Sequence, residues 1–317
     1  MTFGLLLMSL FTFIELNCEN LFDCQHDTLK QDTEFLPDGS YHWTRSRYWR
    51  KLDHIGQTIL ACGEQDSGWQ LPDMAVLCEV ENDTVLRDLT RRSLLRKARY
   101  KYVMTSSPDV RGIDIALVYS PFSFYLLRHH SVRIPTTPGM RPTRDLLYAS
   151  GLIADGDTLH VIAVHWPSKR GGARQTDAFR RRAAETVVSV IDSIKSINPD
   201  ANIIIAGDFN DYSRSENINL LIRHGVQDIS VDATGSHGAR GTYRYKGQWG
   251  SLDHILVSVG LASKFVDCYV MDAPFLLEED QKYGGVKPRR NYLGPRYLNG
   301  FSDHLPLVAR FHFGAQQ

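Results

Sequence analysis

The stretch IIIAGDFND, residues 203–211, decides the fold of this chain of 317 residues and locates its chemistry. Its consecutive apolar residues predict a strand that is covered on both faces, because a half-exposed strand would alternate with polar positions. Gly207 breaks the apolar run, and Asp208 and Asn210 then follow two positions apart, on one side of an extended chain. A carboxylate and a carboxamide on one side suit a Mg²⁺-type ion, or a water and a phosphate oxygen. An Asx-rich turn after a strand explains the same residues equally well.

Apolar runs of strand length, bounded by turn residues, recur on both sides of this stretch. They span residues 11–16, 74–79, 113–119, 146–154, 159–165, 201–207, 251–258 and 305–313. Helical patterns lie between them, most clearly at residues 176–197, and also at 47–62 and 85–98. Mixed strands and helices without a linker predict one domain, residues 1–317, built from two packed sheets flanked by helices.

Two further segments place an acid and an imidazole at the start of a predicted strand. In SDHLPLVARF, residues 302–311, Asp303 and His304 precede the strand and can both reach a cleft, although a capping Asp and a surface His fit as well. In SLDHILVS, residues 251–258, Asp253 lies inside an apolar run, where an ionised carboxylate is costly unless it is paired. A carboxylate–imidazole pair removes that cost and also orients the imidazole.

Two more segments end apolar strands with possible phosphate or metal ligands. VIAVHWPSKRGG, residues 161–172, delivers His165 and then a basic loop, although a histidine in such a place is more often structural. MAVLCEVEND, residues 74–83, ends its strand at Glu79, a candidate metal carboxylate or an ordinary strand-end Glu. Strand ends are where sheet proteins gather catalytic groups on a rigid frame, so the five segments together predict one site.

Composition and charge exclude several classes of protein. The hydrophobic fraction of 43% and the charged fraction of 23% are ordinary for a globular domain and exclude disorder, collagen and coiled coil. The formal net charge is zero, which gives no support to nonspecific binding of nucleic acid. Basic clusters at residues 45–51, 91–101 and 180–182 are either solvated faces or a phosphate-facing surface.

The cysteines and the N-terminal run bear on the compartment. The five cysteines form no CxxC pair and no zinc-spaced cluster, so we expect free thiols in a reducing environment. The run MTFGLLLMSLFTFIELN has no basic start and no cleavage site, and it is too short to cross a bilayer. Its second half predicts the first strand, and we expect a cytoplasmic protein without stable membrane insertion.

The order of Asn17, Glu79, the HWP at 165–167, GDFN at 207–210, LDH at 252–254 and SDH at 302–304 resembles the endonuclease/exonuclease/phosphatase superfamily, which is deoxyribonuclease I-like. The segments NCENLFD, RGIDIALVYS, HWPSKRGG and RYLNGFSDH resemble a bacterial subgroup of it. The resemblance covers nearly the whole chain. It implies a four-layered α/β sandwich, with two mainly antiparallel sheets face to face, helices outside, and the site at one end.

The resemblance also implies the ligands of a metal ion and of the substrate. Glu79 is expected to bind Mg²⁺ or Mn²⁺, with Asn17 and Asp303 alongside. Cationic and hydroxyl side chains within the segments RGIDIALVYS and HWPSKRGG are candidates for holding substrate phosphates. They are Arg111, Ser168, Lys169 and Arg170.

The remaining motif residues are expected to act on the phosphoryl group. By the resemblance, Asp208 and Asn210 hold the attacking water and the scissile phosphate. His304, oriented by Asp253, is the general base or a phosphate ligand, and His165 contacts the phosphate or protonates the leaving oxygen. Whether Asp208 or His304 takes the proton of the water stays open.

Together these residues predict a divalent-metal-dependent phosphodiesterase that uses in-line water attack, in the first place a nuclease (endonuclease or exonuclease). The aromatic residues of the predicted loops at 232–250 and 271–300 could meet bases. These are Tyr243, Tyr245, Trp249, Tyr292 and Tyr297. The alternatives are a phosphatase or phosphodiesterase on a small or lipid phosphoester, of the inositol-phosphate or sphingomyelinase kind, and a catalytically inactive binding module. The complete set of motif residues disfavours the last, and nothing in the sequence indicates the oligomeric state.

Overall fold

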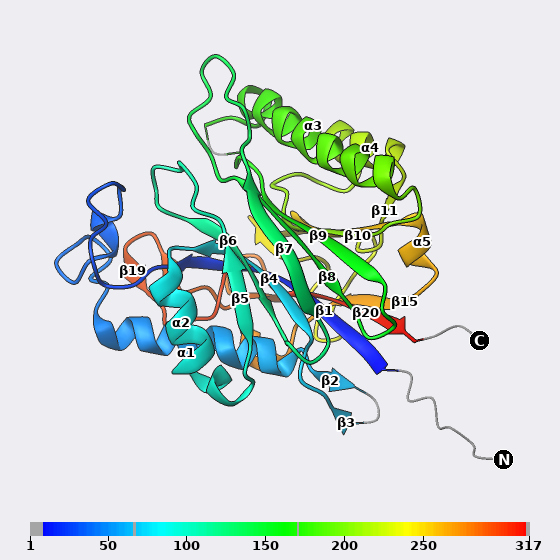
Figure 1. The fold of residues 1–317 in the computed structure, drawn as a ribbon. Helices are drawn as coiled ribbons and strands as arrows, with labels where there is room; N and C mark the ends of the chain where they lie inside the picture. Colours follow the sequence, from blue (N-terminus) through cyan, green and yellow to red (C-terminus); the bar gives the residue numbers. More distant parts are fainter. Residues whose placement is uncertain (1–8, 66–67, 170, 315–317) are drawn as a thin grey trace.

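A computed structural model describes residues 9–65, 68–169 and 171–314, and two six-stranded sheets pack face to face at its centre (Figure 1). The strand order of the first sheet is β15 (Phe265–Val270), β20 (Leu307–Phe313), β1 (Ser9–Leu21), β4 (Met74–Val80), β6 (Asp114–Tyr119) and β5 (Lys101–Met104). The order of the second is β11 (Val226–Asp228), β14 (Asp253–Ser258), β10 (Asn202–Asp208), β9 (Thr158–His165), β8 (Leu146–Leu152) and β7 (Tyr125–Val132). Only β1 with β4 and β9 with β10 run parallel within these two sheets, so both are mainly antiparallel, as predicted.

Helices cover the outer face of each sheet (Figure 1). Helices α1 (Arg45–Ala61) and α2 (Asp83–Arg91) lie against the first sheet, and α3 (Ala173–Ile197) and α4 (Glu216–Arg223) lie against the second. The one-turn α5 (Val259–Ala262) follows β14. Helix α3 buries the apolar stripe that predicted it, including Val187, Ile191 and Ile194. The four-layered α/β sandwich is therefore confirmed.

Gly207 allows β10 to approach β9 closely just before the chain reaches Asp208. Its φ of +148° is a conformation that favours glycine. A Cβ atom there would lie 1.8 Å from the carbonyl oxygen of Val164 on β9, which no side-chain movement can relieve. The glycine thus fixes the register in which Asp208 lies beside His165 of β9 and Asp253 of β14.

In the first sheet, the pairing of the parallel strands β1 and β4 becomes irregular near their carboxyl ends. Pairing of β1 with β4 shifts between Asn17 and Leu21, and pairing of β4 with β6 shifts between Cys78 and Val80. Glu79 is the residue that the second irregularity leaves unpaired, and its φ is +62°. Such bulges re-aim side chains, and here they turn Glu79 out of the sheet plane.

All eight apolar runs of the sequence form strands, and the differences lie at the margins of the fold. Strands β5, β7, β11 and β15 carry weaker patterns and were not predicted. The predicted helix at 85–98 ends at Arg91, and a 3₁₀ helix, Leu94–Lys97, follows; the Ser93 hydroxyl bonds to the Leu89 carbonyl and accepts from Leu95 N–H between them. The predicted first strand begins at Ser9, and residues 1–8 lie outside the described residues. None of the described helices has the length and apolar character needed to cross a membrane.

The long loops predicted at 232–250 and 271–300 contain short hairpins. They are β12 (Tyr243–Tyr245) with β13 (Gln248–Gly250), β16 (Leu277–Glu279) with β17 (Val286–Pro288), and β18 (Tyr292–Leu293) with β19 (Arg296–Tyr297). The strands are too short to bury a face of their own, which is why the sequence showed no period.

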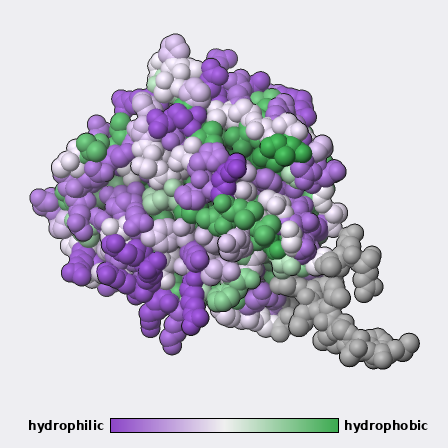
Figure 2. Space-filling model, viewed as in Figure 1, coloured by the Kyte–Doolittle hydropathy of each residue, from purple (hydrophilic) through white to green (hydrophobic). Residues whose placement is uncertain are grey.

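The second sheet ends in an exposed edge strand, β7. Leu127 on β7 and Leu152 on β8 are exposed, and Figure 2 shows hydrophobic patches among mostly hydrophilic residues on this face of the molecule. The same strand carries Arg128, His129 and His130, all exposed. Charged and polar side chains on an edge strand discourage pairing with another chain.

Replacing Gly207 with alanine is expected to destabilise the fold by about 3 kcal/mol, because the new Cβ must displace the backbone of β9. The measurement is the free energy of unfolding from urea denaturation. Gly260→Ala is the matched control: a Cβ there would lie 3.6 Å from the Asp200 carbonyl oxygen, an ordinary van der Waals contact, and the change should be neutral or slightly stabilising. Equal effects of the two substitutions would contradict the role given to Gly207.

Candidate active site

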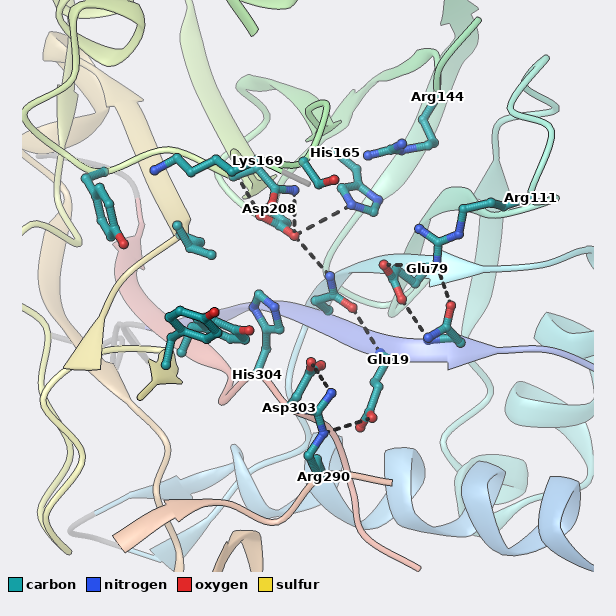
Figure 3. Close-up of a pocket in the computed structure, with 18 residues that line it drawn as sticks. Glu19, Glu79, Arg111, Arg144, His165, Lys169, Asp208, Arg290, Asp303 and His304 are labelled. Atoms are coloured by element: carbon teal, nitrogen blue, oxygen red, sulfur yellow. Dashed lines mark hydrogen bonds and ion pairs between the residues drawn. The ribbon is translucent and has the colours of Figure 1, made fainter. Parts of the chain in front are cut away.

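One pocket of about 700 Å³ lies where the carboxyl ends of β1, β4, β9 and β10 meet (Figure 3). Ten of the twelve site residues predicted from the sequence line it. They are Asn17, Glu79, Arg111, His165, Ser168, Lys169, Asp208, Asn210, Asp303 and His304. The eleventh, Asp253, is fully buried and bonds to His304 from behind. The structure thus brings together residues that are up to 287 positions apart (304 − 17).

Asp208, at the end of β10, is the most connected side chain of the pocket. Its Oδ2 accepts hydrogen bonds from the side-chain amides of Asn17, on the opposite sheet, and Asn210, each at 3.1 Å. Its Oδ1 accepts the backbone N–H of Asn210 at 2.7 Å. Burial raises the pKa of Asp208 to about 7, with the charge of Asp253 adding to the effect and His304 opposing it. Asp208 can therefore exchange a proton near neutrality.

His304 and Asp253 form a buried pair. The ring Nδ1 of His304 lies 2.8 Å from Oδ2 of Asp253, which also accepts the hydroxyl of Thr242. The backbone N–H of His304 donates to Ser302 Oγ at 3.1 Å, and the ring centroids of His304 and Tyr243 are 4.9 Å apart. Burial alone would lower the pKa of His304, but Asp253 outweighs it, and the pKa lies well above its usual value. We conclude that His304 presents a cationic imidazolium to the pocket.

His165 has the opposite character. It is buried at the end of β9, with Nε2 3.6 Å from Oδ2 of Asp208, and its Nδ1 has no hydrogen-bond partner among the described residues. Burial, together with the positive charges of Arg144 and Arg111, lowers its pKa well below the usual value. His165 is therefore a neutral imidazole, so the two histidines of the pocket differ in charge.

An acidic side of the pocket faces these groups. Glu79 accepts the backbone N–H of Asn20 at 2.8 Å and lies 3.7 Å from Arg111, with its side chain 13% exposed. Asp303, 21% exposed, pairs with Arg290 at 3.0 Å. Figure 3 shows Glu79, Glu19 and Asp303 arranged around the pocket.

Glu19 and Arg290 extend this side and were missed from the sequence. Glu19 accepts the backbone N–H groups of Asn291 and Tyr292 at 2.6 and 3.1 Å, and lies 3.6 Å from Arg290. It thereby ties the loop before Asp303 to β1. Glu19 stands in the quoted segment NCENLFD, two residues after Asn17. Neither Glu19 nor Arg290 follows an apolar run directly, so the strand-end pattern did not single them out.

Four lining residues other than glycine have a left-handed backbone conformation. Their φ angles are +50° at Glu19, +57° at Asn20, +62° at Glu79 and +48° at Asn210. Residues with side chains adopt this region at a cost, and such residues gather where function requires a special side-chain direction.

The donor set suits a hard divalent cation. Glu79, Asp303 and the carboxamide of Asn17 offer oxygen atoms to one pocket, and oxygen is the ligand that Mg²⁺ and Mn²⁺ prefer. Asp208, Asp253 and His304 also present ligand atoms within 4.8 Å of one another. Asp253 does not line the pocket, and its Oδ2 already accepts two hydrogen bonds.

Cationic and aromatic side chains form the rim of the pocket. Lys169 lies 3.6 Å from Asp211 and 3.8 Å from the ring centroid of Tyr212. Arg111 donates to Asn20 Oδ1 at 2.5 Å. Ser168 lines the pocket between these groups, and Arg170, also predicted to hold phosphate, lies outside the described residues.

The other basic and aromatic features of the sequence divide between the rim and the interior. Tyr243 and Tyr245 line the pocket, whereas Tyr292 is buried and packs against Trp43. In the basic clusters, Lys51 is buried and bonds to the carbonyl of Phe301. Arg180 is buried as well, so these two members of the clusters do not face solvent.

Comparisons with known proteins agree with this architecture. A model of the endonuclease/exonuclease/phosphatase family matches residues 12–312. An endonuclease/exonuclease/phosphatase family protein from Bacteroides thetaiotaomicron has a similar structure, with a TM-score of 0.61, 15% identity, and coverage of 97% of this chain and 99% of that one. TDP2 from D. rerio, complexed with single strand DNA product, gives a TM-score of 0.57 and 18% identity over 96% of this chain and all of that one. No curated protein sequence matches. From the family model and the shared fold, we conclude that the chain belongs to the endonuclease/exonuclease/phosphatase family.

Proposed function

We propose that the protein is a divalent-metal-dependent phosphodiesterase that hydrolyses a phosphate ester by in-line attack of water, with a nucleic-acid strand as its substrate. The observation that carries the proposal is the pairing, in one pocket, of a carboxylate with a near-neutral pKa and a charged imidazole. Asp208 and His304 are these two groups, and Asp253 supports the second.

Asp208 is suited to be the general base. A base works best when its pKa lies near the working pH, and that of Asp208 is raised to about 7. Asn17 and Asn210 hold its carboxylate in place from two sides. The pKa of His304 is raised well above its usual value by Asp253, so its ring already carries the proton and has no free nitrogen to accept another, which is why we assign the proton of the water to Asp208.

His304 and His165 act on the phosphoryl group in different ways. Negative charge grows on the phosphate oxygens as water attacks, and the imidazolium of His304 stabilises it. The neutral ring of His165 serves as a hydrogen-bond partner for a phosphate or leaving oxygen. Arg111, Ser168 and Lys169 would hold the remaining oxygens of the substrate.

Glu79, with Asn17 and Asp303, would hold the metal ion. Bound there, Mg²⁺ or Mn²⁺ would supply positive charge for the phosphoryl oxygens. Without the ion, Asp303 pairs with Arg290 and Glu79 lies beside Arg111, so the two arginines compensate the negative charge of these acids.

The rim supports a nucleic-acid strand over a compact phosphoester. Tyr212, Tyr243 and Tyr245 line the pocket, and Tyr212 and Tyr245 are 55% and 62% exposed. Exposed aromatic rings beside cations are the means by which proteins bind single strands without reading their sequence. The D. rerio TDP2 structure contains a single strand DNA product on the same fold, which agrees with this choice.

Asp208→Asn and His304→Ala are each expected to lower hydrolysis of bis-p-nitrophenyl phosphate and of a single-stranded oligonucleotide by at least about 10³-fold. Asp208→Asn removes a buried charge, so its thermal unfolding temperature should stay close to that of the parent protein. His304→Ala leaves the fully buried Asp253 without its imidazole partner and should lower the unfolding temperature, so its activity is measured at a temperature where circular dichroism shows it folded. Near-native turnover by either variant would refute the assignment. Turnover of small phosphomonoesters in place of the oligonucleotide would favour a phosphatase.

The pH profile tests the choice of base. Because only ionised Asp208 can accept a proton, kcat/KM should fall about tenfold per pH unit below about pH 7 and level off above it. In Asp208→Asn the residual rate should lose this acid limb, because the side chain that must be ionised is gone. An acid limb that persists unchanged in Asp208→Asn would contradict the assignment.

Glu79→Gln should raise the Mg²⁺ or Mn²⁺ concentration needed for half-maximal activity by at least about tenfold, because a charged ligand is lost. The measurement is a metal titration of the rate after removal of metal with a chelator. Glu216→Gln, at a side chain that is 78% exposed, is the control and should leave the titration unchanged. Full activity of the parent protein in chelator would remove the metal from the proposal.

A further inference from the structure

A second pocket of about 390 Å³ opens beside the first and shares Arg111, Arg144 and Ser168 with it. Figure 3 shows Arg111 and Arg144 on the side of the active site where His165 and Glu79 lie. We call this second pocket the flanking pocket. It is formed by residues 109–111, 139–144 and 167–168, with Gln31 and Phe179.

The flanking pocket has an excess of positive charge. Three arginines line it, and the single acid among its lining residues, Asp109, is bonded to Arg144 at 3.1 Å. Arg141 is exposed and makes no hydrogen bond or ion pair with any part of the chain that the structure describes. A loop that holds an unpaired arginine beside a catalytic pocket is suited to bind an anion.

Two buried donors in the same loop also lack an acceptor. Thr143 Oγ1 and Arg144 Nε are buried and have no hydrogen-bond partner among the described residues, while Arg144 is fixed by Asp109 and by the carbonyl of Trp166 at 2.7 Å. Buried donors without acceptors are costly, and native proteins have few of them. Both residues line the flanking pocket.

Apolar side chains also line the flanking pocket. They are Met140, Pro142, Pro167 and Phe179. A lining of this kind beside cationic side chains matches the mixed surface of a nucleotide, in which a phosphate is attached to a sugar and a base. The apolar residues would make no favourable contact with a free inorganic ion.

We propose that the flanking pocket binds a second phosphate of the same substrate, held by Arg141 and Arg144, while the scissile phosphate occupies the active site. The proposal rests on the proposed function and narrows it to esters that carry a further phosphate on the same molecule. An oligonucleotide and a small bisphosphate share this chemistry.

Matched chromogenic substrates test the proposal. Thymidine 5′-(p-nitrophenyl phosphate) is compared with the same compound carrying a 3′-phosphate, and thymidine 3′-(p-nitrophenyl phosphate) with its 5′-phosphorylated form. In one of the two pairs, the second phosphate should raise kcat/KM about tenfold, the effect of one charge-assisted contact. Arg141→Gln should abolish that increment and leave the rate on bis-p-nitrophenyl phosphate unchanged, whereas the exposed Arg128→Gln, on β7, should retain both.

The outcomes separate the inference from the function on which it rests. No increment in either pair, or an increment that survives Arg141→Gln, overturns the flanking pocket even if the enzyme is active. Absence of hydrolysis of every substrate, bis-p-nitrophenyl phosphate included, refutes the proposed function instead. Inhibition by oligothymidylate and by inositol trisphosphate then distinguishes the two sources of the second phosphate. The compound whose inhibition is weakened by Arg141→Gln is of the class that occupies the flanking pocket. If Arg141→Gln weakens inhibition by neither compound, the proposal is contradicted.

Discussion

The structure of the site depends on one buried carboxylate. Asp208 lies between the two sheets, where its charge is costly, and it is kept there by side chains from both. Asn17 reaches it from β1 of the first sheet, while Asn210 and the strand partners His165 and Asp253 surround it in the second. Because its pKa is set by burial, the same constraint that orders the site also gives Asp208 its ability to exchange a proton.

The fold makes this arrangement possible through the placement of its two parallel strand pairs. In each sheet the central parallel pair delivers its carboxyl ends to the same edge, so that Asn17 and Glu79 face His165 and Asp208. The antiparallel neighbours bring Asp253 and His304 to that edge from their amino-terminal ends. Backbone conformations that most residues avoid occur at this edge, which indicates that the sheets, not the local sequence, hold the side chains there.

Charge is distributed unevenly across the pocket, and this unevenness suits phosphoryl transfer. The acids Glu79, Glu19 and Asp303 lie on one side, and His304 supplies a positive group. A metal ion would therefore have its own side of the pocket, with room for a phosphate against the imidazoles. Arg111 and Arg144 continue the positive surface beyond the reaction centre.

The sequence predicted the central strands and most of the residues that line the pocket, because buried strands produce apolar runs and their polar ends are conspicuous. Weak edges such as β7 were missed, since half-exposed strands with polar residues have little pattern. Arg144 and Arg290 could not be predicted, because each belongs to a loop whose position depends on contacts with residues distant in the chain, Asp109 and Glu19. The charge states of His165 and His304 likewise follow from burial and partners that no local motif encodes.

The central claim is that side chains from both sheets form one site for an ion and a phosphoryl group. It is tested most directly by a crystal structure of the protein soaked with Mn²⁺ and a slowly hydrolysed phosphorothioate ester. We expect an anomalous peak for manganese in contact with Glu79, and the phosphorus atom between it and His304. Manganese bound elsewhere, with the phosphorothioate outside this pocket, would contradict the account.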